Sequence, residues 1–415
     1  MNSRQPEARH DAEVIGLIGL AHGTSHFFQL LLPPLFPWLM KDFSLSYTRV
    51  GLLMTTFFVI SGIGQALAGF VVDRVGAFRV LLFGVGSLAI AGLVLSIANS
   101  YSVLLLAAAL AGTGNSIFHP ADFTILNHRV GQPRLGHAFS MHGLGGNLGW
   151  AAAPVFMAGL ASLVGWHIAG LGATLVAATV LTTLWLRRRT LMDPEEEAIA
   201  QAQQGQSTAP AHPFAFLSSS AVWLSFAFFL VTTIAFGILQ NYGPSILDHV
   251  YGVSHVVSTG GLTAYLLGSA GGMIIGGFLA ERGDRLVATA LGFAALMSVI
   301  LASGAMPQLA LWPLMAAMGF GVGMAGPGRD LLVRRAATSR FGRSSFGRVY
   351  GFVYSGLDTG QALSPVLFGP LLDAGHFRPA LFAVAVLQAS GLFFALHVGS
   401  RVQAPTPLAT AATPP

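Results

Sequence analysis

The sequence predicts an all-α integral membrane protein with twelve transmembrane helices in two parallel, pseudo-symmetric six-helix halves. Three observations support this prediction: the composition, the spacing of the long apolar segments and an internal repeat. Of the 415 residues, 53% are hydrophobic and only 9% are charged, whereas soluble domains carry about 25% charged residues. This shortage of charge excludes a soluble enzyme, a disordered chain and a disulfide-stabilised secreted domain.

Long apolar segments define the helices, because a bilayer core requires about 20 mainly apolar residues per helix. Dividing the chain at charges and at Pro/Gly clusters gives spans over residues 14–40, 50–72, 79–98, 102–126, 137–163, 167–186, 214–247, 256–280, 286–306, 308–333, 347–372 and 377–398. A long polar stretch separates the sixth span from the seventh. We therefore predict an N-terminal bundle (1–186), a cytoplasmic linker (187–213), a C-terminal bundle (214–400) and a cytoplasmic tail (401–415).

Basic residues are distributed unevenly between the two sides of the predicted bundle. If both termini and the linker lie on one side, the loops of the other side carry only Lys41, Arg49 and Arg378. Loops rich in Lys and Arg stay on the cytoplasmic side of a membrane. We therefore predict a multi-pass protein of the cell (inner) membrane with both termini in the cytoplasm. The net charge of +5 then reflects topology, and we expect no nucleic-acid partner.

The two halves share short motifs in the same order. GFVVDRVG (69–76) follows the second span and GFLAERGD (277–284) follows the eighth. The fifth and eleventh spans share a pattern, in which Gly136, Gly145, Gly149 and Pro154 recur as Gly347, Gly356, Gly360 and Pro365. Parallel six-helix repeats are typical of secondary transporters, whose substrate site lies near the midplane between the halves.

The twelve spans, the repeat and the G-x-x-x-D-R motif (Gly69, Asp73, Arg74) resemble the major facilitator superfamily. Segments SHFFQ (25–29), FSLSYTRVGLL (43–53), LLAAALAGTGNSIFHP (105–120) and GHAFSMHGLGGNLG (136–149) resemble its fosmidomycin-resistance-type exporters. The resemblance implies a transporter, not an enzyme, that works by alternating access without a cofactor. It also implies that the third, sixth, ninth and twelfth spans face lipid and that the other eight line a central cavity.

Ionisable residues inside the spans follow that division. Placing a charged side chain at the bilayer centre costs roughly 2.5–3.5 kcal/mol, so we expect such a residue to have a function. The interiors of the third, sixth and ninth spans contain none, and the twelfth has only His397 near its end. We therefore predict that substrate and protons bind at His22, His26, Gln29, His119, Asp122, His142, Asn147, Asn241, Tyr265, Arg329, Tyr354, Asp358 and Gln361.

The histidines of the first and fourth spans are candidate proton carriers. His22 and His26 share one helix face, as do His119 and Asp122. Imidazole has an ordinary pKa near 6.5 and can carry a proton under cellular conditions. The alternative is that these side chains only hydrogen-bond neighbouring helices as part of the packing.

The chain departs from its apparent relatives at two acids. Relatives of the fosmidomycin type carry His-x-x-Asn-Asp in the first span and Phe-His-Pro-Glu in the fourth. Here His26 and His119 match, but residues 29–30 are Gln-Leu and Ala121 replaces the Glu. Asp122 comes one residue later, about 100° around the helix. Either Asp122 and the histidines have taken over proton coupling, or the coupling differs.

Two further ionisable residues lie in the second half. Asp358 sits in the middle of the eleventh span, where a deep carboxylate suits reversible protonation, although a structural role is the alternative. Arg329 lies near the cytoplasmic end of the tenth span and aligns with Asp122 in the repeat. Three roles are open for Arg329: an ion pair with Asp122 that closes the cytoplasmic mouth, a contact to an anionic substrate, or snorkelling to the interface.

Two loop motifs and several glycines point to conformational change. Asp73–Arg74 and Glu281–Arg282 follow the second and eighth spans, where an acid can dock on the positive end of a neighbouring helix. The resemblance implies that Asp73 docks near the start of the eleventh span and holds the cytoplasmic side closed. Glycines spaced four residues apart give small faces to the fifth, eighth and eleventh spans, which lets helices approach closely.

Together these observations predict a proton-coupled antiporter that exports a small anionic or amphipathic compound, such as a drug or phosphonate, and thereby confers antibiotic resistance. The alternative is a proton-coupled uptake symporter for an organic anion or another small nutrient. We expect a monomer whose partners are the substrate, protons and the lipid bilayer. A membrane enzyme or a sensor without transport is disfavoured, because the sequence contains no His-Glu-x-x-His motif, nucleotide-binding loop or Cys/His metal cluster. We also expect no metal site.

Overall fold

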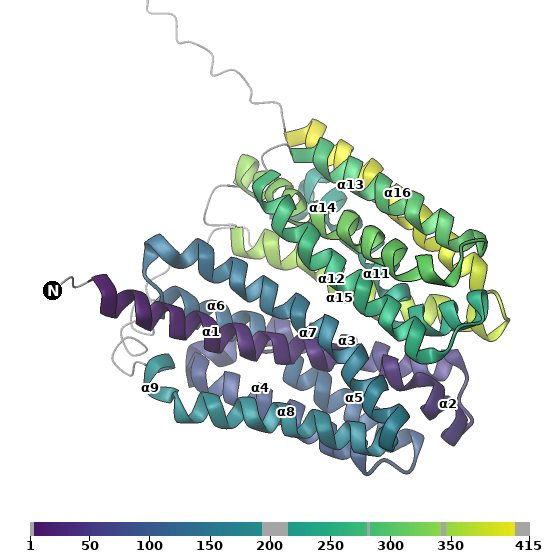
Figure 1. Ribbon diagram of the computed structural model, residues 1–415. Coiled ribbons are helices and arrows are strands. Elements are labelled where there is room, and N and C mark those ends of the chain that lie inside the picture. Colours follow the sequence, from purple (N-terminus) through teal and green to yellow (C-terminus); the bar gives the residue numbers. More distant parts are fainter. Residues whose placement is uncertain (1–3, 193–214, 280–282, 342–345, 403–415) are drawn as a thin grey trace, which may run out of the picture.

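A computed structural model describes residues 4–192, 215–279, 283–341 and 346–402 (Figure 1). All regular elements in these ranges are helices. Eleven described segments are long and apolar enough to cross a membrane. The twelfth long helix is α15 (Phe346–Asp373), which contains Asp358 and Gln361. The predicted all-helical membrane fold is confirmed.

The N-terminal half contains six spanning segments, two of which are interrupted. Its elements are α1 (Arg4–Gln29), η1 (Pro33–Leu35), α2 (Phe36–Phe43), α3 (Tyr47–Val75), α4 (Ala77–Ser96), α5 (Tyr101–Asn115), α6 (Phe118–Arg129), η2 (Gln132–Arg134), α7 (Leu135–Val164), α8 (Trp166–Leu186) and α9 (Arg188–Leu191). The predicted spans 14–40 and 102–126 each correspond to one membrane-crossing segment, Glu7–Phe43 and Tyr101–Arg129, within which the helix is interrupted. Pro33 and Pro34 follow the end of α1, and Pro120 lacks the N–H that would bond the Ser116 carbonyl, so each helix is interrupted near a proline.

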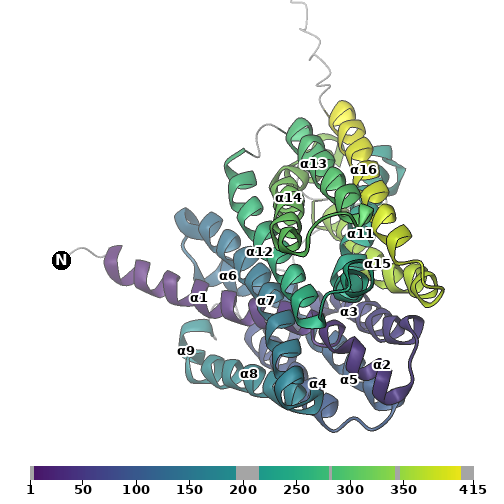
Figure 2. The ribbon, with the colours of Figure 1, turned by 45° about the vertical axis from the view of Figure 1, so that its right-hand side comes forward.

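The C-terminal half repeats this arrangement with uninterrupted helices. Its elements are η3 (Ala215–Ser218), α11 (Ser220–Tyr251), α12 (His255–Leu279), α13 (Gly283–Ser303), η5 (Gln308–Ala310), α14 (Leu311–Phe341), α15 and α16 (Phe377–Val402). In the first half α1 packs on α7, α3 on α5 and α4 on α8. In the second half the corresponding helices pair in the same way, α11 with α15, α12 with α14 and α13 with α16. Figure 2 shows the two groups of helices side by side.

The halves meet through two equivalent helix pairs, α3 with α15 and α7 with α12. Glycine permits the closest approaches inside each half, as predicted. A Cβ atom added to Gly145 of α7 would lie 2.5 Å from the carbonyl oxygen of Gly19 in α1. Likewise, a Cβ atom on Gly360 of α15 would lie 2.8 Å from the carbonyl oxygen of Leu230 in α11. These helices therefore pack backbone against backbone.

Polar contacts join the two halves at the end of the bundle where α2 lies, opposite the N-terminus (Figure 1). The Asp373 carboxylate accepts hydrogen bonds from the backbone N–H groups of Tyr47 (2.6 Å) and Thr48 (3.0 Å) at the start of α3. The Tyr242 hydroxyl of α11 donates to the carbonyl oxygen of Tyr47 at 3.1 Å. By our topology prediction this joined end faces the outside of the cell.

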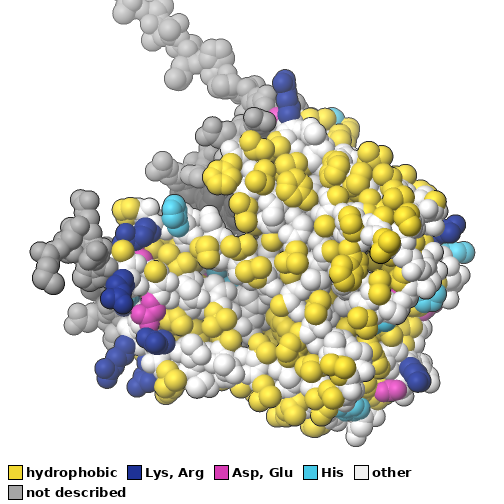
Figure 3. All heavy atoms as spheres, in the orientation of Figure 1, with side chains coloured by type: hydrophobic (Ala, Val, Ile, Leu, Met, Phe, Trp, Pro, Cys, Tyr) yellow, Lys and Arg dark blue, Asp and Glu magenta, His cyan; other side chains and the backbone are white. Residues whose placement is uncertain are grey.

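Apolar side chains cover the middle of the surface, and charged side chains gather at its two edges (Figure 3). Helices α4, α8, α13 and α16 contribute large exposed apolar residues, among them Phe83, Ile90, Leu175, Leu296, Val386 and Phe393. Such a surface suits contact with lipid.

Candidate functional site: the cavity between the halves

A cavity of roughly 330 Å³ lies between the two halves. Its described lining residues come from α1, α3, α5, α6 and α7 of the first half and from α11, α12, α14 and α15 of the second. None of these lining residues belongs to α4, α8, α13 or α16. Its size falls within the range of pockets that enclose small molecules.

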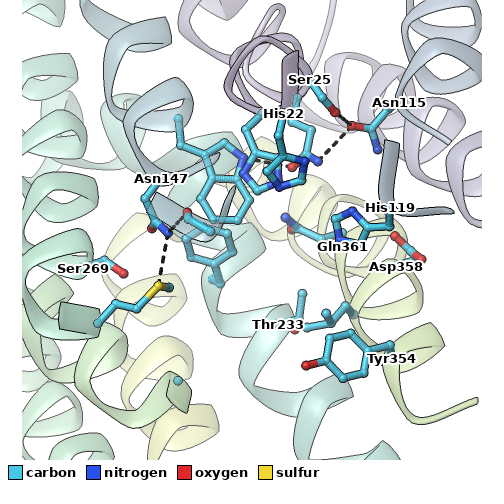
Figure 4. A pocket seen from close by; sticks show the side chains of 18 of the residues that line it. His22, Ser25, Asn115, His119, Asn147, Thr233, Ser269, Tyr354, Asp358 and Gln361 are labelled. Carbon is cyan, nitrogen blue, oxygen red and sulfur yellow. Dashed lines mark hydrogen bonds between the residues drawn. The ribbon is translucent and has the colours of Figure 1, made fainter. Parts of the chain in front are cut away.

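Most of the predicted site residues line this cavity. They are His22, His26, Gln29, His119, His142, Asn147, Arg329, Tyr354, Asp358 and Gln361. Figure 4 shows several of them pointing into a common space, with His22 and Asn147 from the first half and Tyr354 and Asp358 from the second. Asp122 is fully buried directly behind His22 and His142.

Two predicted site residues, Asn241 and Tyr265, are not among the residues that line this cavity, and their roles stay predictions. Asn241 is five residues beyond Phe236, the last lining residue of α11, and therefore points about 140° away around the helix. Tyr265 lies one turn before the lining residue Ser269, with its ring 6.2 Å from that of Phe236. Both side chains are buried.

Four imidazoles and one carboxylate form a cluster in the first half. The Nε2 atom of His142 lies 3.0 Å from Oδ2 of Asp122, and Nδ1 of His22 lies 3.3 Å from the same oxygen. The rings of His22 and His142 are stacked with centroids 3.5 Å apart. The rings of His26 and His119 lie 4.3 Å and 5.2 Å from that of His22. The cluster can therefore hold protons in several positions around one buried carboxylate.

A hydrogen-bond network of neutral side chains lies beside this cluster. Asn115 Oδ1 accepts from the hydroxyl of Ser25 (2.6 Å) and from the amide of Gln29 (3.0 Å), while its own amide donates to Ser61 (2.7 Å). The indole N–H of Trp150 donates to Gln29 at 2.9 Å. Ser25, Asn115 and Trp150 were not predicted as site residues. Of these three, Asn115 could have been predicted from the sequence, because it lies one helical turn before His119.

The second half contributes fewer ionisable groups to the cavity. Asp358 Oδ2 accepts a long hydrogen bond, 3.5 Å, from the amide of Gln65 in the opposite half. The guanidinium of Arg329 lies 4.5 Å from the centre of the Phe229 ring, a distance at which a cation is attracted to an aromatic face. Among the lining residues that the structure describes, Arg329 is the only Lys or Arg.

In this conformation Asp122 does not pair with Arg329. Its Oδ2 atom faces His22 and His142, and its Oδ1 atom has no hydrogen-bond partner. The predicted ion pair is thus absent here, although we expected it for a state with a closed cytoplasmic mouth.

The predicted conformational switch is described only in part. Gly69 and Arg74 belong to the last turns of α3, where Arg74 is exposed. Glu281 and Arg282 lie outside the described residues, as does the side chain of Asp73. The docking of Asp73 on α15 therefore stays a prediction.

One group of side chains has the composition of a metal site. Ligand atoms of His22, Asp122 and His142 all lie within 4.8 Å of one another. The three residues come from α1, α6 and α7, so no local sequence motif could have predicted this group.

Comparisons with known proteins agree with this architecture. The sequence profile of the Major Facilitator Superfamily matches residues 18–340. The fosmidomycin resistance protein of Escherichia coli (strain K12) is 29% identical over 284 residues, which cover 67% of this chain and 68% of that protein. The uncharacterized MFS-type transporter YfnC of Bacillus subtilis (strain 168) is 26% identical over 390 residues, with 91% of each chain covered.

Solved structures share the fold. A crystal structure of a bacterial homologue of the human lysosomal transporter Spinster, in an inward-facing and occupied conformation, matches with a TM-score of 0.70. The match covers 94% of this chain and 97% of that chain at 16% sequence identity. An inward-facing, unoccupied structure of such a homologue matches with a TM-score of 0.71.

Proposed function

Because the chain belongs to the Major Facilitator Superfamily and is therefore a secondary transporter that works by alternating access, we propose that it exports a small anionic or amphipathic compound in exchange for protons. We place it in the inner membrane as a monomer with both termini in the cytoplasm. The distribution of arginines between the loops supports this orientation.

The observation that carries the proposal is the excess of basic over acidic side chains among the residues that line the cavity. Four imidazoles from the first half and the Arg329 guanidinium from the second line the cavity, against the Asp358 carboxylate as the one lining acid among the described residues. When the imidazoles are protonated, this cavity is positively charged and attracts anions. Helix α6 begins at Phe118, next to His119, and its positive end adds to this preference.

Asp358 is our candidate for the residue that binds and releases the coupling proton. Its hydrogen bond comes from Gln65 of the opposite half, so the surroundings of the carboxylate change when the halves separate. A carboxylate whose surroundings alternate between two states also alternates in proton affinity, and coupled transport requires that property. Asp122 is the alternative, but the contacts described for it, His22 and His142, belong to its own half.

The direction of transport rests on a relative. The Escherichia coli protein that is 29% identical carries the name fosmidomycin resistance protein, which favours export of a toxic compound. An uptake symporter on the same scaffold remains the alternative function, because the cavity chemistry serves either direction.

The proposal can be tested by measuring accumulation and growth in a deletion strain of the source organism. We expect the deletion to raise the intracellular level of at least one phosphonate antibiotic, organic acid or drug, and the intact gene to restore the lower level. A matched strain carrying Asp358→Asn should express the protein without restoring it. Loss of growth on a nutrient, with no compound accumulating, would instead establish uptake and overturn export.

A further inference from the structure

The histidine–aspartate cluster brings three potential metal ligands together inside the protein. His22 Nδ1 and His142 Nε2 approach the same carboxylate oxygen of Asp122 at 3.3 Å and 3.0 Å. Zinc binds imidazole nitrogen and carboxylate oxygen at about 2.0–2.2 Å, so two ligands on a tetrahedral ion are about 3.4 Å apart. These two separations are close to those of a coordinated set, and all three ligand atoms lie within 4.8 Å of one another.

The cluster also contains buried polar atoms that have no hydrogen-bond partner. Asp122 has no exposed surface, and His22 and His142 are 3% and 5% exposed. Asp122 Oδ1 and His22 Nδ1 have no hydrogen-bond partner. A buried carboxylate is costly unless a cation or hydrogen bonds compensate its charge. A divalent ion held between these side chains would give His22 Nδ1 a partner and would compensate the charge of the Asp122 carboxylate.

Binding an ion requires one small rearrangement. The planes of His22 and His142 differ by only 24°, so the two rings lie nearly parallel and their nitrogens point side by side. One ring must turn about its Cβ–Cγ bond so that both nitrogens converge on the ion. This torsion has broad minima in histidine, so the movement is inexpensive.

We propose that His22, Asp122 and His142 bind a divalent transition-metal ion of the Zn²⁺ type. Two imidazoles and one carboxylate form a ligand set that holds Zn²⁺ while leaving a fourth position open. The open position faces the cavity, which His22 and His142 line. His26 and His119 surround the ion site on the cavity side and are the other titratable groups described next to it.

This inference deepens the proposed function, because a metal ion at this place would offer an anionic substrate a direct ligand position. It would also displace the protons that the imidazoles otherwise carry, since only the neutral imidazole binds a metal. Metal binding itself can nevertheless be measured without substrate, membrane potential or transport. A failure of the metal site can therefore be distinguished from a failure of the transporter proposal.

The test is a titration of the purified full-length chain, carrying no histidine tag, with Co²⁺. Tetrahedral Co²⁺ in a mixed nitrogen and oxygen site absorbs visible light strongly, whereas octahedral aqueous Co²⁺ absorbs weakly. We expect one Co²⁺ per chain with the tetrahedral spectrum, and displacement of Co²⁺ by Zn²⁺.

Three variants show whether the cluster is the binding site. His142→Ala and Asp122→Asn should each weaken Co²⁺ binding at least tenfold and abolish the tetrahedral spectrum. His137→Ala is the matched control on the same helix: its side chain is exposed five residues before His142, and we expect binding as in the parent. Thermal unfolding of each variant verifies that it is folded. Co²⁺ binding that is absent from the parent, or equal in the parent and folded His142→Ala, would overturn the proposal.

Discussion

The contact between Asp373 and the start of α3 predicts how firmly one end of the transporter is closed. The first backbone N–H groups of a helix have no partner within the helix. In α3 the Ser46 hydroxyl accepts from Arg49, while Asp373 of the other half accepts from Tyr47 and Thr48. Asp373 therefore completes the cap of a helix to which it does not belong, and it can do so only while the halves are in contact.

The effect of removing this carboxylate follows from its surroundings. The three hydrogen bonds to Asp373 are exposed, so water replaces them when they break and no buried group is left unpaired. A helix cap contributes about 0.5–2 kcal/mol and a charge at the helix end about 0.3–1 kcal/mol. We therefore expect Asp373→Ala to weaken the closed state by about 1–2 kcal/mol, which is roughly a 5- to 30-fold change in its equilibrium constant. Asp373→Asn retains one acceptor and should have a smaller effect.

The assay measures the labelling rate of one introduced cysteine. No other thiol reacts, because the sequence contains no cysteine. Ser245 is buried beside Tyr47 at the joined end, and Ser245→Cys introduces a thiol of similar size. A membrane-impermeant maleimide should react roughly 5 to 30 times faster when Asp373→Ala is added. Asp42→Ala is the matched control, because Asp42 accepts from Trp166 within the first half only.

An unchanged labelling rate in a folded Asp373→Ala protein would refute this reasoning. A pH series supplies a second test. Burial raises the pKa of Asp373, hydrogen bonds from Thr48 and Tyr47 lower it, and the net pKa lies below the ordinary value. The carboxylate therefore stabilises closure above the ordinary value of about 3.9, and this stabilisation is lost as the pH falls through the lowered pKa. Labelling should thus be independent of this group between about pH 6 and 8.

Three other predictions concern the cavity and the packing. Asp358→Asn should remove the pH dependence of transport, because the amide cannot carry a proton; an unchanged profile in proteoliposomes would move the coupling to Asp122. Arg329→Gln should raise the KM of an anionic substrate about tenfold or more, since hydrogen bonds to charged groups contribute about 1.5–3 kcal/mol; an unaltered KM would argue against this contact. Gly145→Ala should lower the unfolding temperature by the equivalent of about 1–3 kcal/mol, because its Cβ would press on α1. Gly159→Ala, on the same helix in open space, should not, and equal effects of the two substitutions would contradict backbone packing.

The sequence was sufficient for the features that depend on composition and periodicity. Apolar segments about one bilayer thick predict the helices, and the avoidance of ionisable residues in four spans predicts which helices line the cavity. Prolines alone do not predict the interruption of the first and fourth spans, because Pro154, Pro244 and Pro365 lie inside helices that continue through them.

Contacts between helices could not be predicted in the same way. Helical spacing places His22 and His26 on one face of α1, but it does not say which faces of α6 and α7 oppose them. Asp122 of α6 meets His22 of α1 across a sequence separation of a hundred residues, and that meeting depends on how α1 packs against α6. Asn241 shows the same limit, because the sequence places it in a cavity-lining helix but does not say which way its side chain points.

The helix pair α3–α15 carries both the predicted contact of Asp73 and the observed contact of Asp373. Asp373 at the end of α15 caps the start of α3 at one end of the bundle. Asp73 near the end of α3 is expected to dock at the start of α15 at the other end, because the two helices run in opposite directions. Each helix of the pair would then carry an acid that stabilises the other helix only when that end is closed. Since rigid halves that rock against each other cannot close both ends around a central cavity, we expect the two contacts to form in alternation. The substitutions Asp73→Asn and Asp373→Asn should therefore shift the carrier in opposite directions, toward opening at the N-terminal end and at the α2 end, respectively.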